Sequence, residues 1–281
     1  MHTVVVTGGT DGLGKGLALH YLRRGAHVIA VGSTRARGEA LIEEAAASDG
    51  RVTFLQADLT SVRASRELVA TIEETCQAVD QLVLCAQRYR LLGPRSLTGE
   101  GFEHSFALAY LSRYVLSHGL RGLLERAPRP VVLNVGTPGI PLGRIHWDDP
   151  QLTRRYSGTR ATLQSFRAND LLGVAYAELY PGTPVRYIGY NPGVVATGMP
   201  DHLPQPLRAL TKASFALFAT SVGKAVTPMA RLLDDPPATA FTAYRGKRPV
   251  PLKGAAFDRT AALRLHALTR DLLDTAVTPS G

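Results

Sequence analysis

The sequence is poor in cysteine and has no long hydrophobic run. Only two of its 281 residues are cysteines, Cys76 and Cys85, and two thiols without a CxxC motif are not plausible metal ligands. No apolar run approaches the roughly 18 residues of a membrane helix. We therefore expect no metal and no membrane partner. A strand begins at Thr3, which leaves no room for a signal peptide, so we expect a cytoplasmic protein.

Lysine is also scarce: it supplies only five of the 32 basic residues, and none lies between Lys15 and Lys212. This arginine bias, with abundant Ala, Gly and Pro, is typical of a GC-rich bacterial genome. The formal net charge is +9, but the basic residues are dispersed and are not interleaved with aromatics as in single-strand-binding proteins. We expect no nucleic-acid partner.

What the sequence does contain is a glycine-rich turn near its start. The β-branched run Thr3–Val6 leads into Thr7 and then into Gly8, Gly12 and Gly14, after which an amphipathic pattern begins. A strand, glycine turn and helix in this order bind a dinucleotide, because the turn is tight and the helix N-terminus offers free N–H groups to phosphate. A glycine-rich turn that binds nothing is the alternative.

Strand and helix patterns alternate along the rest of the chain without a break in composition. This alternation predicts one doubly wound Rossmann domain over residues 1–281, with a mostly parallel seven-stranded sheet and helices on both faces. Residues at about 198–220 are expected to form a lid over the carboxyl ends of the strands. The six central strands are expected at 3–6, 27–31, 52–56, 81–86, 131–135 and 185–190.

The end of the second expected strand indicates which dinucleotide binds. An acidic residue there would hold a ribose 2′-OH, whereas a basic residue accepts a 2′-phosphate. The chain has Ser33, Thr34 and Arg35, followed by Arg37, so NADP(H) is favoured over NAD, although both arginines could simply be solvated. Asp58, after the third expected strand, could accept a hydrogen bond from adenine or only shape the turn.

Several motifs together resemble the short-chain dehydrogenase/reductase superfamily, in its retinol-dehydrogenase and protochlorophyllide-reductase-like branch. TGGTDGLG is similar to the family's TGxxxGxG turn, and the resemblance covers nearly the whole chain. The other matching segments are Ala57-Asp58-Leu59, Gly101-Phe102-Glu103, Leu111-Ser112-Arg113-Tyr114, Gly143 to Asp149, Arg155-Tyr156-Ser157 and Pro192-Gly193-Val194-Val195-x-Thr197.

The resemblance implies a set of cofactor-binding residues. They are Thr7, Gly8, Thr10, Asp11, Gly12, Leu13, Gly14, Ser33, Thr34, Arg35, Asp58, Leu59, Ala86, Pro192, Gly193, Val195 and Thr197. Where the family has glycine after its fourth strand, this chain has Gln87. The Gln87 side chain would lie beside the cofactor ribose, where it could weaken binding or reach into the active site.

The family's catalytic Asn, Ser, Tyr and Lys are not retained. The register set by Ser165 to Asn169 places Thr162 at the Tyr position and Phe166 at the Lys position, while Ala109 replaces the Asn and Thr137 the Ser. The near-match Tyr156-x-x-x-Arg160 is rejected, because Tyr156 matches a non-catalytic tyrosine of this branch. Without a tyrosine and a lysine, ordinary carbonyl reduction loses its general acid.

Three kinds of function remain open at this point. The first is a non-redox biosynthetic enzyme that catalyses cyclisation, dehydration or isomerisation, with Thr137, Thr162, Gln87, Tyr190 and Tyr89 as candidate pocket residues. The second is an NADPH-dependent oxidoreductase with a replacement proton donor, for which Tyr110, Tyr190 and His146 are candidates. The third is a non-catalytic NADP-binding sensor or scaffold.

Two further expectations concern partners. Apolar residues in the expected lid favour a hydrophobic small-molecule substrate: Leu203, Leu207, Leu210, Phe215 and Phe218. The resemblance also implies a homodimer or homotetramer formed through the helices expected at 101–126 and 158–180, although this branch includes monomers.

Overall fold

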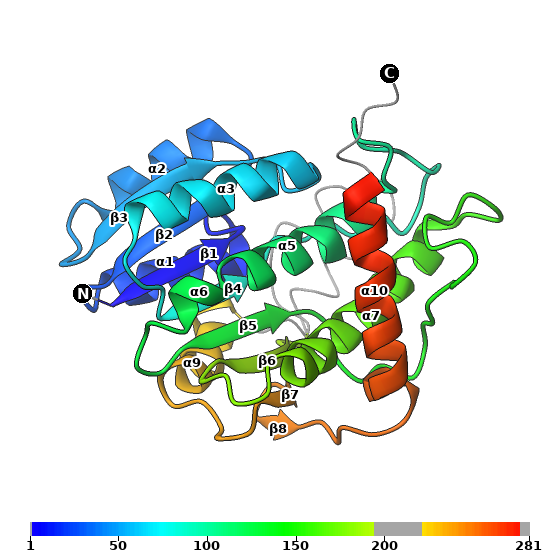
Figure 1. Cartoon of the computed structure of the whole chain (residues 1–281). Coiled ribbons are helices and arrows are strands. Elements are labelled where there is room, and N and C mark those ends of the chain that lie inside the picture. Colours follow the sequence, from blue (N-terminus) through cyan, green and yellow to red (C-terminus); the bar gives the residue numbers. More distant parts are fainter. Residues whose placement is uncertain (1, 194–220, 276–281) are drawn as a thin grey trace.

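A computed structural model of the chain describes residues 2–193 and 221–275 (Figure 1). The expected lid at about 198–220, together with Val195 and Thr197, lies outside the described residues.

Eight strands form one sheet in the order β3-β2-β1-β4-β5-β6-β7-β8. The first seven are parallel, and the strand order reverses between β1 and β4, which is where this class of sheet binds its ligands. The strands are β1 (Thr3–Thr7), β2 (His27–Gly32), β3 (Arg51–Gln56), β4 (Gln81–Leu84), β5 (Val131–Val135), β6 (Arg186–Asn191), β7 (Phe241–Arg245) and β8 (Arg248–Pro249).

The doubly wound fold is confirmed, but the count of seven strands is wrong by one. The additional β8 is a two-residue antiparallel strand at the edge of β7, joined to it by a turn at Gly246. A strand this short has no alternation of side chains from which to predict it.

Helices cover both faces of the sheet (Figure 1). The α-helices are α1 (Gly12–Leu22), α2 (Arg35–Ala45), α3 (Val62–Thr75), α4 (His104–Phe106), α5 (Ser112–Gly119), α6 (Arg121–Leu124), α7 (Gly158–Leu179), α9 (Val222–Asp234) and α10 (Arg259–Thr275). A π-helical segment η1 (Ala107–Leu111) and a short 3-10 helix η3 (Ala255–Phe257) complete the set described. The helix at 158–180 is confirmed as α7. The stretch at 101–126 is helical from His104 to Gly119, with η1 as a π-helical segment inside that helix, and a turn at Leu120 separates it from α6.

Alternate residues along the buried strands contribute side chains to two hydrophobic cores, one on each face of the sheet. Val5 and Leu82 belong to the core shared with α3, α5, α7 and α10, whereas Val4 and Val83 belong to the core shared with α1, α2 and α9. Both faces of the parallel strands are therefore apolar, as burial on both sides requires. The polar side chains that matter for function lie at the carboxyl ends of the strands.

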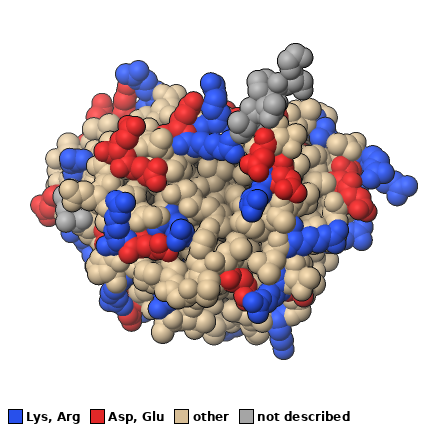
Figure 2. Space-filling view, viewed as in Figure 1, with Lys and Arg blue, Asp and Glu red and all other residues tan. Residues whose placement is uncertain are grey.

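The outer surface carries charges of both signs side by side (Figure 2). Many arginines pair with a neighbouring carboxylate, as Arg35 does with Glu39 and Arg121 with Glu125. Such exposed pairs contribute little stability. In the described ranges, no helix is both long and apolar enough to cross a membrane.

Candidate active site

The glycine turn between β1 and α1 has a shape that only glycine permits. Gly8 and Gly12 have positive φ angles, +64° and +51°, which side-chain-bearing residues rarely adopt. A Cβ on Gly14 would lie 2.3 Å from the Gly8 carbonyl oxygen. The first turn of α1 therefore lies directly on the loop, with its N-terminus at the strand-order reversal, where a pyrophosphate would be held.

Thr7 joins this turn to the end of β4. Its buried hydroxyl donates to the Val83 carbonyl at 3.4 Å and accepts from the Ala86 N–H at 3.1 Å. A Cβ on Gly8 would approach the Ala86 backbone within 3.1 Å. The predicted cofactor residues Thr7, Gly8 and Ala86 are thus brought together in one rigid cradle.

Asp11 and Arg37 form an ion pair beside the glycine turn. One Asp11 oxygen caps α1 by accepting from the Gly12 N–H at 2.7 Å, and the other accepts from the Arg37 guanidinium at 2.7 Å. Arg35 instead pairs with Glu39 on its own helix. Arg37 therefore contacts the glycine turn through Asp11, and a role of Arg35 in cofactor binding stays a prediction.

Asp58 shapes its own turn. One of its carboxylate oxygens accepts from both the backbone N–H and the hydroxyl of Thr60, at 3.0 and 2.8 Å. This is the turn-forming role left open by the sequence. A contact of Asp58 with adenine stays a prediction, as does one of the neighbouring Leu59, which is buried.

The positions expected to hold catalytic Tyr and Lys lie together on α7. Thr162 is only 6% exposed, and the Phe166 ring meets the Tyr89 ring edge-on with centroids 5.7 Å apart. A threonine hydroxyl without a neighbouring ammonium is a weak acid, and a phenyl ring cannot supply the missing charge. These two residues form a packed wall rather than an acid–base pair.

Ala109 stands at the position of the family's catalytic asparagine, so no side-chain amide is present there. Ala109 lies within the π-helical segment η1, and its backbone carbonyl accepts a hydrogen bond from Asn169 Nδ2 at 2.7 Å. Asn169 Oδ1 accepts from Asn134 Nδ2 at 3.0 Å, and Asn134 Nδ2 also donates to the Tyr187 hydroxyl at 3.0 Å. A closed amide network therefore fills this part of the site.

Arg113 is a functional candidate that the sequence analysis missed. This α5 residue is 2% exposed, and its guanidinium lies beneath the ends of β4 and β5. It donates to Asn134 Oδ1 at 2.5 Å, to the Val135 and Ala86 carbonyls at 2.7 and 3.1 Å, and to Gln87 Oε1 at 3.2 Å. Gln87 is thus anchored at the active-site floor by its carbonyl oxygen.

Asp170 was also missed. It lies on α7, is 3% exposed, and accepts from the Gly139 N–H at 3.1 Å. Burial raises the pKa of Asp170 to about 8, against the smaller opposing effects of that hydrogen bond and the charge of Arg167. At neutral pH it is mainly a neutral, proton-bearing acid.

The candidate tyrosines and His146 fall into different environments. Tyr190 belongs to the α1/α9 core, away from the side on which Thr162 and Phe166 lie, and burial raises its pKa to about 12. Tyr110 is buried and shares a hydrogen bond of 2.7 Å with Thr269, which fits a packing role. His146 lies 3.3 Å from the Arg160 guanidinium, and burial followed by that charge lowers its pKa.

Tyr156, the rejected alternative to Thr162 as the catalytic tyrosine, donates to the Glu103 carboxylate at 3.2 Å, which gives it a structural partner.

On the predicted cofactor side, Gly193 has a φ of +75° and its N–H donates to the Asn191 side chain at 2.8 Å. Pro192 and Gly193 therefore form a tight turn at the end of β6. The described residues contain no cluster of three metal-ligating side chains.

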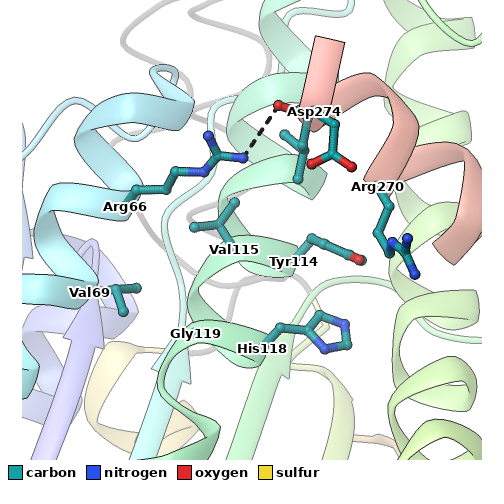
Figure 3. Close-up of a pocket in the computed structure, with 9 residues that line it drawn as sticks. Arg66, Val69, Tyr114, Val115, His118, Gly119, Arg270 and Asp274 are labelled. Carbon is teal, nitrogen blue, oxygen red and sulfur yellow. Dashed lines mark hydrogen bonds between the residues drawn. The ribbon is translucent and has the colours of Figure 1, made fainter. Parts of the chain in front are cut away.

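A surface groove of about 320 Å³ lies elsewhere, between α3, α5 and α10 (Figure 3). Tyr114 and His118 line it from α5, while Arg66 lines it from α3. Arg66 donates to the Leu273 carbonyl at 3.4 Å. None of the predicted site residues lines this groove.

Comparison with known proteins agrees with this geometry. Residues 2–207 match the sequence profile of the short chain dehydrogenase family. The chain belongs to this family. It is 32% identical over 218 residues to a polyprenol dehydrogenase of Danio rerio, covering 74% of this chain and 66% of that protein. It is 29% identical to retinol dehydrogenase 14 of Mus musculus, covering 80% and 71% of the two chains.

Two further relatives match almost the full length of the chain. A Streptomyces sp. (strain C5) protein provisionally described as daunorubicin C-13 ketoreductase is 28% identical, covering 94% of this chain and 89% of its own. Among solved structures, an uncharacterized protein from Mycobacterium Paratuberculosis superposes with a TM-score of 0.73 at 25% identity, covering 98% and 94%. A metagenomic short-chain oxidoreductase in complex with NADP shares the fold, with a TM-score of 0.63 at 19% identity, covering 87% and 96%.

Proposed function

We propose that the protein binds NADP(H) in the glycine cradle and catalyses a non-redox step on a hydrophobic small molecule in a biosynthetic sequence: a cyclisation, dehydration or isomerisation. Gly8, Gly12 and the α1 N-terminus would hold the pyrophosphate, and Arg37 would accept a 2′-phosphate. The bound cofactor would supply a flat nicotinamide surface at the pocket. The chain's own side chains would orient the substrate and handle its protons.

The observation that carries this proposal is the pair Thr162 and Phe166. The family position for the general acid holds a buried hydroxyl of low acidity, and the position for the ammonium holds a phenyl ring packed on Tyr89. A reduction needs a proton for the developing alkoxide, and general-acid help supplies about 10²–10⁴-fold in rate. The glycine turn supports dinucleotide binding, whereas the positions of the family's tyrosine and lysine hold no acid and no cation.

Exposed leucines on two loops that contact the start of α7 favour a hydrophobic substrate. Leu92 and Leu142 are 67% and 65% exposed, and Leu91 lies beside Leu92. The loops that carry these leucines contact the start of α7. A Cβ on Gly158 would overlap the backbone of Arg90 and Leu91, and one on Gly143 would overlap the Leu163 carbonyl oxygen. Exposed apolar side chains near a binding site are typical of proteins that bind apolar ligands.

The alternative is an NADPH-dependent oxidoreductase with a replacement proton donor. The names of the related proteins, retinol and polyprenol dehydrogenases and a ketoreductase, point in this direction. One structural feature favours it: Tyr89, in the loop after β4, packs edge-on against Phe166, which places a tyrosine beside the position of the family's lysine.

Replacing Arg37 by alanine tests the cofactor assignment. Loss of a charge-assisted contact to the 2′-phosphate should weaken NADPH binding by about 10–100-fold and leave NADH binding unchanged, as measured by calorimetric titration. Arg63→Ala, which removes an exposed arginine of α3, is the matched control. Equal losses for NADPH and NADH would show that Arg37 does not recognise the phosphate.

Rebuilding the family pair tests the catalytic part. The double variant Thr162→Tyr/Phe166→Lys should reduce a bound carbonyl probe at least about 10²-fold faster than the wild type, because the general acid and its cation are restored. Retinal and daunorubicin serve as probes, with nicotinamide absorbance as the readout. A wild type that already oxidises NADPH as fast as the double variant would favour the oxidoreductase alternative.

A further inference from the structure

Arg113 is a buried cation whose hydrogen-bond partners among the described residues are all neutral oxygens. It donates to the backbone carbonyls of Ala86 and Val135 and to the side-chain oxygens of Asn134 and Gln87. Burying a guanidinium with only neutral partners is costly. The protein therefore holds a positive charge at the ends of β4 and β5 that none of these partners neutralises.

The Gln87 side chain can face this guanidinium in only one orientation. A guanidinium donates hydrogen bonds and accepts none, so Gln87 Oε1, at 3.2 Å from Arg113 Nη2, must be the atom that faces it. The amide Nε2 is thereby turned away from Arg113, and it has no hydrogen bond to the described residues. Gln87 is half-buried, so its two N–H groups remain available to a ligand.

Gln87 lies beside the glycine cradle, at the same edge of the sheet as Thr137. Leu84 of β4 is paired with Asn134 of β5, and Gln87 and Thr137 each follow three residues later. The residue before Gln87 donates its N–H to the Thr7 hydroxyl of the cradle at 3.1 Å. The carboxyl edge next to the strand-order reversal is where sheets of this class bind their ligands. The amide is therefore at the end of the sheet where a substrate is expected.

We propose that the Gln87 amide donates a hydrogen bond to the carbonyl oxygen of the substrate, and that Arg113 is the positioning residue that orients and polarises this amide. The substrate class is a ketone or aldehyde on an apolar skeleton, whose carbonyl oxygen gains negative charge during the reaction. Arg113 draws electron density from Oε1, which makes the Nε2 protons stronger donors. The donor is fixed before the reaction starts, so it need not reorient when the charge develops.

This inference rests on the proposed function only in that a carbonyl compound binds beside the cradle. It does not supply the family's missing acid, because the Gln87 amide keeps its protons throughout. An amide N–H stabilises a developing oxyanion but cannot neutralise it. The hydrogen bond therefore fits a non-redox step and leaves the argument from Thr162 and Phe166 unchanged.

The carbonyl stretch of a bound ketone tests the hydrogen bond directly, because a donor to the oxygen lowers the stretching frequency. The probe is 2-acetylnaphthalene with a carbon-13 label in its carbonyl group, read by infrared difference spectroscopy in the presence of NADP+, which cannot donate a hydride. The wild type should bind the probe and lower its stretch relative to the probe in hexane. Gln87→Met keeps the length of the side chain without an N–H. It should abolish most of the lowering and weaken binding by about 3–10-fold.

Gln87→Glu separates the two hydrogen-bonding ends of the side chain. Its carboxylate can still accept from Arg113 but has no N–H for the ligand, so the stretch should move as in Gln87→Met while the fold is kept. Gln56→Met is the matched control, since it removes an exposed amide that donates to the Ser33 carbonyl, and it should leave the stretch unchanged. Arg113→Lys, which keeps the charge, should retain more of the lowering than Arg113→Gln.

The proposal is overturned if the wild type binds no probe, or if the stretch in Gln87→Met and Gln87→Glu equals that in the wild type. It is also overturned if Gln87→Met weakens NADP+ binding and leaves the stretch unmoved, which would assign the amide to the cofactor. Hydride transfer by the wild type from NADPH would refute the non-redox function but would not move the stretch. The two failures are therefore distinguishable.

Discussion

The Gly14→Ala variant should bind NADPH at least about 10²-fold more weakly than the wild type and should unfold more readily. The added Cβ would lie 2.3 Å from the Gly8 carbonyl oxygen and 2.8 Å from its carbon. These atoms belong to backbone, so no side chain can turn aside, and α1 or the turn must move. Overpacking of this kind costs roughly 1–3 kcal/mol or more.

Calorimetric titration with NADPH and thermal unfolding together measure both effects. Gly122→Ala is the matched control, because a Cβ there meets nothing within 4 Å and alanine favours the helix by up to about 1 kcal/mol. A Gly14→Ala protein that binds NADPH normally would mean that the cradle does not hold the cofactor.

Replacing Asp170 by asparagine should remove a strong pH dependence of stability. The folded-state pKa of Asp170 is raised from 3.8 to about 8, so the folded chain keeps this proton over a range where the unfolded chain has released it. Its contribution to stability is fully present below 3.8 and is lost as the pH rises towards 8. The loss is about 1.4 kcal/mol per pH unit across that window.

Asparagine cannot titrate, yet its carbonyl can still accept from the Gly139 N–H. Asp170→Asn should therefore be more stable than the wild type near pH 8, and the difference should shrink steadily towards about pH 5. Urea unfolding at several pH values measures it. Asp271→Asn, which removes an exposed carboxylate from α10, should show no such trend. An Asp170→Asn protein that is less stable at pH 8 would show that the charged form is favoured in the fold.

The glycine turn could be predicted because glycine spacing in a sequence indicates where the backbone needs a positive φ or a close approach. Gly8, Gly12 and Gly14 are needed where the backbone turns with positive φ or passes close to itself. The alternation of strands and helices and the α7 helix also followed from apolar periodicity. These features depend on local spacing, which a sequence displays directly.

Arg113 and Asp170 could not be predicted in this way. A charged residue on an amphipathic helix is usually exposed, and nothing in its neighbours indicates that it turns inward. Arg113 is buried because the π-turn before α5 and the ends of β4 and β5 converge on it. Asp170 is buried because Gly139 donates to it from a loop 31 residues away. Both depend on contacts distant in sequence.

Tyr89 shows the same limit. Its residue type made it a pocket candidate, but its contact with Phe166 joins the loop after β4 to α7, which are far apart in the sequence. The π-helical segment η1 within the predicted helix is another case, since apolar spacing continues unchanged through Ala107–Leu111.

Transfer of deuterium from C4-labelled NADPH to a bound carbonyl probe tests the central claim most directly. The wild-type protein is incubated with daunorubicin or retinal and with each stereoisomer of the labelled cofactor, and the products are examined by mass spectrometry. Thr162→Tyr/Phe166→Lys provides the positive control. We expect the label in the product of the double variant and none in that of the wild type; label transferred at the same rate by the wild type would contradict the account.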